Sequence, residues 1–287
     1  MQHFSPGRFE VLPPVIKNLL IINALVFLGQ TTADMWGEGA WVTDFFALHN
    51  IQSPLFKPHQ LVTHLFMHGD FFHLFFNMFA LWMFGNILEN LWGPKRFLIF
   101  YFLSGFGAAA MHMTVLSYEY SQLSRDIAML QYLPTPDRFG AFVEKYPRLL
   151  MLQFSEDAAT GLSPKNVGSL LADWVNDPKN NNYIDLALSY ARGYESFSLN
   201  LPTVGASGAV FGALAAFGYL FPNTYIYIYF FFPLKAKWFV ILYAGAELWM
   251  GLRNSGGNVA HFAHLGGALI GFLLVYYWNK KDRKTFY

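Results

Sequence analysis

One serine in this chain lies among glycines near the start of a long apolar run. It is Ser207, in the stretch 202-PTVGASGAVFGALAAFGYL-220. A serine hydroxyl is a weak nucleophile until a base takes its proton, and His264, in another apolar run, is a candidate base. Small residues also serve packing, because Gly208 and Gly212 form a GxxxG step that lets two membrane helices approach closely. The stretch therefore favours either helix packing or nucleophilic catalysis.

Two further polar residues lie at a similar depth in a third apolar run. His73 and Asn77 are four residues apart, so they share one face of a helix. At about 1.5 Å of rise per residue, all four polar side chains lie roughly 5–10 Å below the outer ends of their helices. Polar groups in membrane helices usually face the bundle interior and mark function. Their coincidence predicts one site, in which the Asn77 amide, the His73 ring and the backbone N–H of Ser207 stabilise an oxyanion.

Glycines on two of the runs are spaced to bring the serine and the histidine together. They are Gly208, Gly267 and Gly271. Residues without side chains let two helix backbones approach closely enough for a hydrogen bond between Ser207 and His264. No aspartate lies at the matching depth to orient His264, so a Ser–His dyad is expected rather than a triad. Glu247 is the one deep acid in the spans, and it suits either packing or a proton relay.

Composition and motifs exclude several other chemistries. The chain has no cysteine, which excludes thiol catalysis and cysteine-ligated zinc, and it has no HExxH motif. Four histidines recur at spacings of four or five, but Pro58 removes the first from any common helix: His59, His64, His68 and His73. We therefore expect no metal and no cofactor. A net charge of +1, without a basic patch, also predicts no nucleic-acid partner.

The totals indicate a membrane protein. Hydrophobic residues make up 54% of the chain and charged residues 13%, whereas soluble domains carry about 25% charged residues. Six apolar runs approach the ~20 residues that cross a bilayer core. They cover residues 15–33, 71–91, 97–117, 203–221, 237–252 and 259–278. The sequence predicts an all-α protein of six transmembrane helices, and the aromatic run 225-YIYIYFFFP-233 either extends the fifth or lies at the membrane interface.

Lysine and arginine residues in the short connections predict the orientation, because such residues favour the cytoplasmic side. Those flanking the spans fall on one side, except Arg253 in the last loop, which places both termini in the cytoplasm. We expect three segments: 1–117 with spans one to three, an extracytoplasmic helical insertion at 118–202, and 203–287 with spans four to six and a cytoplasmic tail. The helices expected within the insertion cover 137–154, interrupted at Pro147, 165–175 after Ser163-Pro164, and 183–194, closed by Gly193.

At the polar residues described above, the sequence resembles the rhomboid family of intramembrane serine proteases. The matching pieces are 68-HGDFFHLFFN-77, 205-GASG-208 and 263-AHLGGALIG-271. They stand in the family's order and on the expected spans, and the resemblance covers the six spans while omitting the insertion. It implies a six-helix rhomboid-like bundle that encloses a polar site open to the outside.

The resemblance also implies roles for single residues. Ser207 would be the nucleophile and His264 the general base, with His73, Asn77 and the Ser207 amide as the oxyanion hole. Gly205 would shape the turn that carries the serine. Other residues match the family's pattern less closely or differ from it. Phe211 stands where many members have a tyrosine against the catalytic histidine, and His68 matches a histidine near the outer end of span two. His59-Gln60 replaces the pair, often Trp-Arg, that many members have in the first loop.

By the same resemblance the partners are the lipid bilayer and single-span membrane proteins, cut in or near their spans. The compact six-span form suggests a bacterial inner membrane. Two other functions compete with the protease. One is a catalytically inactive relative that binds membrane clients, and the other is a small transporter, although the polar groups cluster near one membrane face and no inverted repeat is evident.

Overall fold

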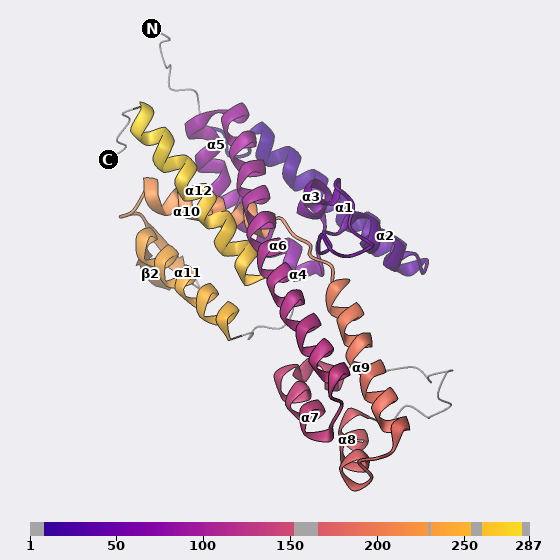
Figure 1. Ribbon diagram of the computed structural model, residues 1–287. Coiled ribbons are helices and arrows are strands. Elements are labelled where there is room, and N and C mark those ends of the chain that lie inside the picture. Colours follow the sequence, from indigo (N-terminus) through magenta and orange to yellow (C-terminus); the bar gives the residue numbers. More distant parts are fainter. Residues whose placement is uncertain (1–8, 152–165, 229–230, 254–259, 283–287) are drawn as a thin grey trace. The chain divides into compact units, whose positions relative to one another are not determined.

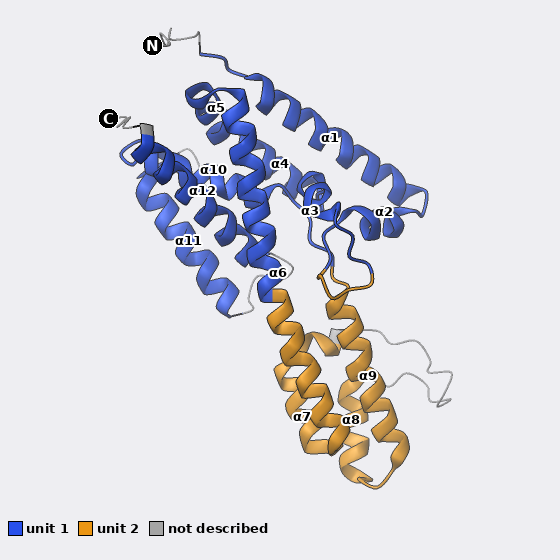
Figure 2. Ribbon diagram, turned by 45° about the horizontal axis from the view of Figure 1, so that its top comes forward, with its two compact units in different colours: residues 1–49, 55–115, 202–287 blue, residues 50–54, 116–201 orange. Residues whose placement is uncertain are grey.

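The computed structural model describes residues 9–151, 166–228, 231–253 and 260–282. It divides into two compact units, coloured separately in Figure 2. Unit 1 comprises residues 1–49, 55–115 and 202–287, and unit 2 comprises residues 50–54 and 116–201. Unit 2 thus includes nearly all of the segment that the sequence analysis treats as an insertion.

Unit 1 is a bundle of helices, labelled in Figure 1. Its first part contains α1 (Pro14–Met35), α2 (Gly39–Phe46), α3 (Gln60–Thr63), the 3₁₀ turn η1 (His64–Phe66), α4 (Phe71–Ala80), the π-helical turn η2 (Leu81–Gly85) and α5 (Asn86–Trp92). The long helix α6 (Pro94–Tyr132) begins in unit 1 and ends in unit 2. The last part contains α10 (Ser207–Leu220), β1 (Tyr225–Ile228), β2 (Phe232–Lys235), α11 (Ala236–Leu252) and α12 (His261–Asp282).

Helix occupies most of each predicted run, which confirms the all-α membrane class. Among the described residues, four helical stretches are long and apolar enough to cross a bilayer: Pro14–Met35, Phe71–Trp92, Pro94–Tyr132 and His261–Lys281. Helix α10 is a shorter apolar helix of 14 residues and α11 has 17. Helix α10 lies at the centre of the core, with most of its side chains buried on all sides. A helix that is apolar all round is the expected form of such a central element.

Helix α10 begins at Ser207, later than the predicted start at 203. The backbone before it is extended, because Thr203 pairs with Leu48 through two hydrogen bonds of 2.8 and 2.9 Å. Gly205 then adopts a φ of +126°, which glycine tolerates and other residues avoid. The chain therefore turns sharply into the helix, and Ser207 is its first residue.

Helices α10 and α12 form the most extensive helix pair of the described structure. Their backbones touch at glycines. This is evident from where a methyl group, placed on each glycine in place of its hydrogen, would lie. On Gly267 it would lie 1.9 Å from the carbonyl oxygen of Gly208, and on Gly271 it would lie 2.6 Å from the Cα atom of Gly212. Only glycine fits at such a separation, so glycines at these positions allow the two helices to pack closely.

In its described residues, the aromatic run before span five does not extend the helix of that span. Strands β1 and β2 pair antiparallel, with Tyr225 opposite Lys235 and Tyr227 opposite Pro233. Alternating β-branched and aromatic residues favour strands, and Pro233 prevents the helix from starting earlier. Helix α11 begins directly after the hairpin, at Ala236.

Unit 2 contains α7 (Pro136–Lys145), the 3₁₀ turn η3 (Pro147–Met151), α8 (Val167–Asn176) and α9 (Asn181–Leu199), together with the end of α6. Its core centres on Trp174 and Phe139, which are fully buried. Asn166 caps α8 by accepting a hydrogen bond from the amide of Ser169, whereas the predicted cap Ser163-Pro164 lies outside the described residues. Helix α9 continues past Gly193, because its buried face runs on to Tyr194 and a single glycine inside a packed helix is tolerated.

Candidate active site

Ser207 is positioned by the turn at Gly205. The amide of Gly205 donates to the carbonyl of His64 at 2.9 Å, which ties the turn to the first loop. A methyl group on Gly205 would lie 2.9 Å from the Nε2 atom of His73 and 3.5 Å from the hydroxyl oxygen of Ser207. The serine hydroxyl and the His73 ring thus border the same small space. As the first residue of α10, Ser207 also has a backbone N–H without an intrahelical acceptor.

His264 lies on α12, the helix that packs against α10. Its ring stacks on Phe211, with ring centroids 4.2 Å apart and an angle of 5° between the planes. Phe211 is four residues after Ser207 and therefore on the same face of α10. Among the described residues, the Ser207 hydroxyl makes no hydrogen bond to His264. Catalytic hydrogen bonds are often long or poorly aligned before substrate binds, so this arrangement is compatible with a nucleophile and its base.

His73 and Asn77 project from α4, whose first turn is capped by Asp70. The Asp70 carboxylate accepts from the His73 amide at 2.9 Å. The amide of Gly69 donates to Nδ1 of His73 at 3.3 Å, which leaves the proton of a neutral ring on Nε2, the atom that faces Gly205. The Nδ2 donor of Asn77 is buried and has no hydrogen-bond acceptor in the described structure. Both side chains can thus donate a hydrogen bond to a further group.

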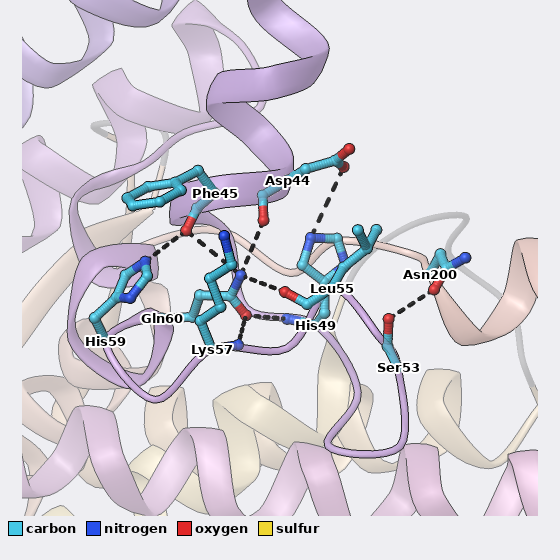
Figure 3. Close-up of polar contacts among 9 residues, drawn as sticks. All are labelled: Asp44, Phe45, His49, Ser53, Leu55, Lys57, His59, Gln60 and Asn200. Atoms are coloured by element: carbon cyan, nitrogen blue, oxygen red, sulfur yellow. Dashed lines mark hydrogen bonds and ion pairs between the residues drawn. The ribbon is translucent and has the colours of Figure 1, made fainter.

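The loop before span two is held by Gln60, which is completely buried (Figure 3). Its side-chain nitrogen donates to the carbonyls of Asp44 and Leu55, each at 2.9 Å. Its side-chain oxygen accepts from the amide of Lys57 at 3.1 Å, and Nε2 of His59 lies 2.7 Å from the carbonyl of Phe45. The pair that departs from the family pattern therefore fixes the loop internally.

A narrow cavity adjoins Ser207, with about 10 Å³ open to the centre of a water molecule. Two histidines that the sequence analysis assigned to no role line it, His64 and His112. Nε2 of His112 lies 2.9 Å from the hydroxyl of Thr203, and Nδ1 of His64 lies 2.6 Å from the carbonyl of Gln60. The rest of its lining is mainly apolar, so the two histidines, Thr203 and Ser207 supply its polar groups.

The contact that sequence reasoning did not anticipate is between Glu247 and His264. Oε2 of Glu247, on α11, lies 3.0 Å from Nδ1 of His264 and 2.6 Å from Nδ1 of His261. The sequence has no aspartate at the depth of His264, and it predicted that Glu247, the one deep acid, serves packing or a proton relay. The position of Glu247 deep in its span was the one sequence signal for this contact. No sequence pattern gives the rotation of α11 against α12, which decides whether the two side chains meet.

Comparison with known protein families decides the lineage. The Rhomboid domain model matches residues 56–191 and 183–281, which is well over half of the chain. The chain belongs to the rhomboid family. Membership of this family agrees with the integral, multi-pass helical bundle described above.

Individual rhomboid relatives are distant in sequence. The chain is similar to the mitochondrial Rhomboid protein 1 of Saccharomyces cerevisiae, with 24% identity over 292 residues that cover 98% of this chain and 60% of the relative. It is also similar to the mitochondrial RHOMBOID-like protein 12 of Arabidopsis thaliana, with 25% identity over 260 residues that cover 89% of this chain and 56% of the relative. The chain thus spans somewhat more than half the length of these relatives.

The names of these rhomboid relatives bear on the expected membrane. Both proteins are named as mitochondrial, as is an uncharacterized rhomboid protein of Schizosaccharomyces pombe with 27% identity over 298 residues. The expectation of a bacterial inner membrane therefore gains no support from them. The predicted orientation of the termini remains a prediction.

Proposed function

We propose that this chain is an intramembrane serine endopeptidase in which Ser207 is the nucleophile and His264 the general base. The observation that carries the proposal is the stack of His264 on Phe211, at 4.2 Å between centroids. Because Phe211 follows Ser207 by one turn, the stack sets the imidazole on the face of α10 that bears the serine. An activated serine needs such a base within reach of its hydroxyl.

The reaction follows the two steps of serine hydrolysis. Nε2 of His264 takes the hydroxyl proton while Oγ of Ser207 bonds to the scissile carbonyl carbon, and the carbonyl oxygen becomes an oxyanion. Collapse breaks the C–N bond, and His264 returns the proton to the leaving amine. Water, deprotonated by His264, then hydrolyses the acyl ester and regenerates the serine.

The oxyanion requires donors that are already in place. Three groups around Ser207 qualify: Nε2–H of His73, the Nδ2 of Asn77 and the backbone N–H of Ser207. The Asn77 donor supports this role most strongly, because a buried donor without an acceptor costs roughly 1–3 kcal/mol and such a cost is tolerated where function needs it.

The substrates we propose are single-span membrane proteins. A peptide bond in a helix is shielded, so the substrate span must unwind locally to reach the serine, and glycine or proline near its outer end promotes cleavage. With both termini cytoplasmic, cleavage releases the outer part of the substrate. Residues 118–202 would lie on that outer side, where they select or admit substrates. Unchanged cleavage of every tested substrate after their deletion would remove this last idea.

A serine-directed fluorophosphonate probe tests the proposal. In detergent, the wild-type chain should be labelled and should cleave a single-span substrate, whereas Ser207→Ala and His264→Ala should do neither. Ser121→Ala is the matched control, because the Ser121 hydroxyl donates only to the carbonyl of Ser117 in its own helix. Labelling and cleavage that persist in Ser207→Ala would refute the protease and favour a client-binding or transport role.

A further inference from the structure

A buried carboxylate at the edge of the candidate site lies between two imidazoles. Glu247 is 3% exposed, and its oxygen Oε2 lies 2.6 Å from Nδ1 of His261 and 3.0 Å from Nδ1 of His264. All three residues lie in described parts of unit 1. Burying a charge without partners is costly, so the two rings are the groups that stabilise this carboxylate.

The carboxylate decides where the imidazole protons are. An ionised carboxylate only accepts hydrogen bonds, so an Nδ1 atom that faces it must carry a hydrogen. In a neutral ring this leaves Nε2 without a proton and with a free lone pair. That is the tautomer in which His264 can take the proton of the Ser207 hydroxyl. When His264 becomes positive during the reaction, the adjacent negative charge stabilises it.

Glu247, His261 and His264 could also bind a metal ion, since their donor atoms all lie within 4.8 Å of one another. Two ligands of one zinc ion are about 3.3 Å apart in a tetrahedral site with bonds of 2.0–2.1 Å. The 2.6 Å between Glu247 and His261 is shorter and has the geometry of a hydrogen bond. The observations therefore favour a proton-sharing cluster over a metal site.

We propose that Glu247 is a positioning residue that holds His264 in its reactive tautomer and orientation, so that Ser207, His264 and Glu247 act as a triad. This inference rests on the proposed protease function. The Glu247–His264 pair is within reach but lacks the alignment of a hydrogen bond in the free protein. A small rotation of the ring, as it takes the serine proton, completes the bond. His261 contacts the same oxygen of Glu247 and holds the carboxylate in place.

The test compares Glu247→Gln with wild type in detergent, by substrate cleavage and by the rate of fluorophosphonate labelling. Loss of the charge should lower kcat by about 100-fold or more while KM stays within threefold, because the residue acts on the base and does not touch substrate. Glu247→Asp keeps the charge but shortens the reach, so its kcat should lie between the two. Treatment of wild type with EDTA should leave kcat unchanged.

The control is Glu89→Gln. Glu89 is another buried glutamate of unit 1, but it accepts from the amides of Val15 and Ile16, each at 2.8 Å, and belongs to the packing of α1. Its substitution should lower the melting temperature and leave the kcat of the folded fraction unchanged, which separates a structural role from a positioning role.

Several results would overturn the triad. One is a Glu247→Gln variant with wild-type kcat beside an inactive Ser207→Ala, which leaves the protease standing. Should Glu247→Gln not fold, a wild-type kcat in folded Glu247→Asp has the same meaning. Activity lost in EDTA and restored by zinc would assign the cluster to a metal instead. An active Ser207→Ala would instead overturn the protease itself.

Discussion

A single methyl group on Gly267 tests whether the contact between α10 and α12 aligns the candidate site. In Gly267→Ala the new carbon would lie 1.9 Å from the carbonyl oxygen of Gly208. A carbon and a carbonyl oxygen approach no closer than about 3.3 Å, so the helices must separate by roughly 1.4 Å at this point. The contact lies beside both proposed reacting groups, because Gly208 follows Ser207 and Gly267 lies one turn after His264.

Two opposing effects on stability can be compared. Replacing glycine by alanine inside a helix stabilises it by about 1 kcal/mol. Overpacking costs about 1–3 kcal/mol, and here the clash is with backbone, which cannot change rotamer. The clash therefore exceeds the gain, and Gly267→Ala should be less stable than wild type. The catalytic effect should be larger, since displacing reacting groups by about 1 Å can cost on the order of 100-fold in rate.

Gly245→Ala is the matched control for this substitution. Gly245 lies inside α11, and a methyl group there would meet nothing within 4 Å. It should leave fluorophosphonate labelling and cleavage unchanged and leave the melting temperature equal or higher. Labelling and melting in detergent measure both effects on the same samples. A Gly267→Ala variant that reacts as fast as Gly245→Ala would refute the view that this contact aligns the serine and the histidine.

Three other substitutions test separate parts of the molecule. Gln60→Ala removes the amide that ties the first loop and should lower the free energy of unfolding by roughly 2–3 kcal/mol, at about 1 kcal/mol per lost bond, as thermal unfolding can measure. Asn77→Ala should slow cleavage by about 100- to 1,000-fold without loss of stability, and an unchanged rate would exclude Asn77 from the oxyanion hole. Burial, and then the bonded carboxylate of Asp126, raise the pKa of Tyr146, so the folded state retains a proton that the unfolded chain loses above about pH 10. Stability should therefore fall as the pH rises past 10, and Tyr146→Phe should reduce that fall in melting curves.

The transmembrane helices were predictable because hydropathy over about 20 residues is a local signal. Helix α11 begins at Ala236 and ends at Leu252, against a predicted range of 237–252. The ends of helices that depend on packing against other segments of the chain were not predictable. Helix α6 runs on to Tyr132, well past the predicted 117, because Leu123, Ile127 and Leu130 bury an amphipathic face in unit 2. Polar residues between them hide this continuation from a hydropathy window.

For the candidate site, the sequence could indicate how deep each residue lies along its helix, and the catalytic roles remain a prediction. Ser207, His264, His73 and Asn77 were expected at similar depths, and the structure places His73 and Ser207 about the turn at Gly205 and His264 against Phe211. The contact of Glu247 with His264 depends on how far α11 is rotated about its axis. That rotation results from tertiary packing, for which a single sequence carries no local signal.

The stack on Phe211 and the contact with Glu247 control different motions of the same imidazole. A stack at 5° between planes holds the plane of the ring, but it is equally favourable after a half-turn about the ring's own bond to the chain. Such a flip would turn a C–H group toward the carboxylate and take Nδ1 away from it. The carboxylate at 3.0 Å distinguishes the two orientations, whereas the phenylalanine ring, lacking a hydroxyl, does not. A base that must take a proton from one direction needs both contacts. Loss of the stack should therefore cause disorder of the whole ring, while loss of the carboxylate should leave a well-packed ring in two orientations.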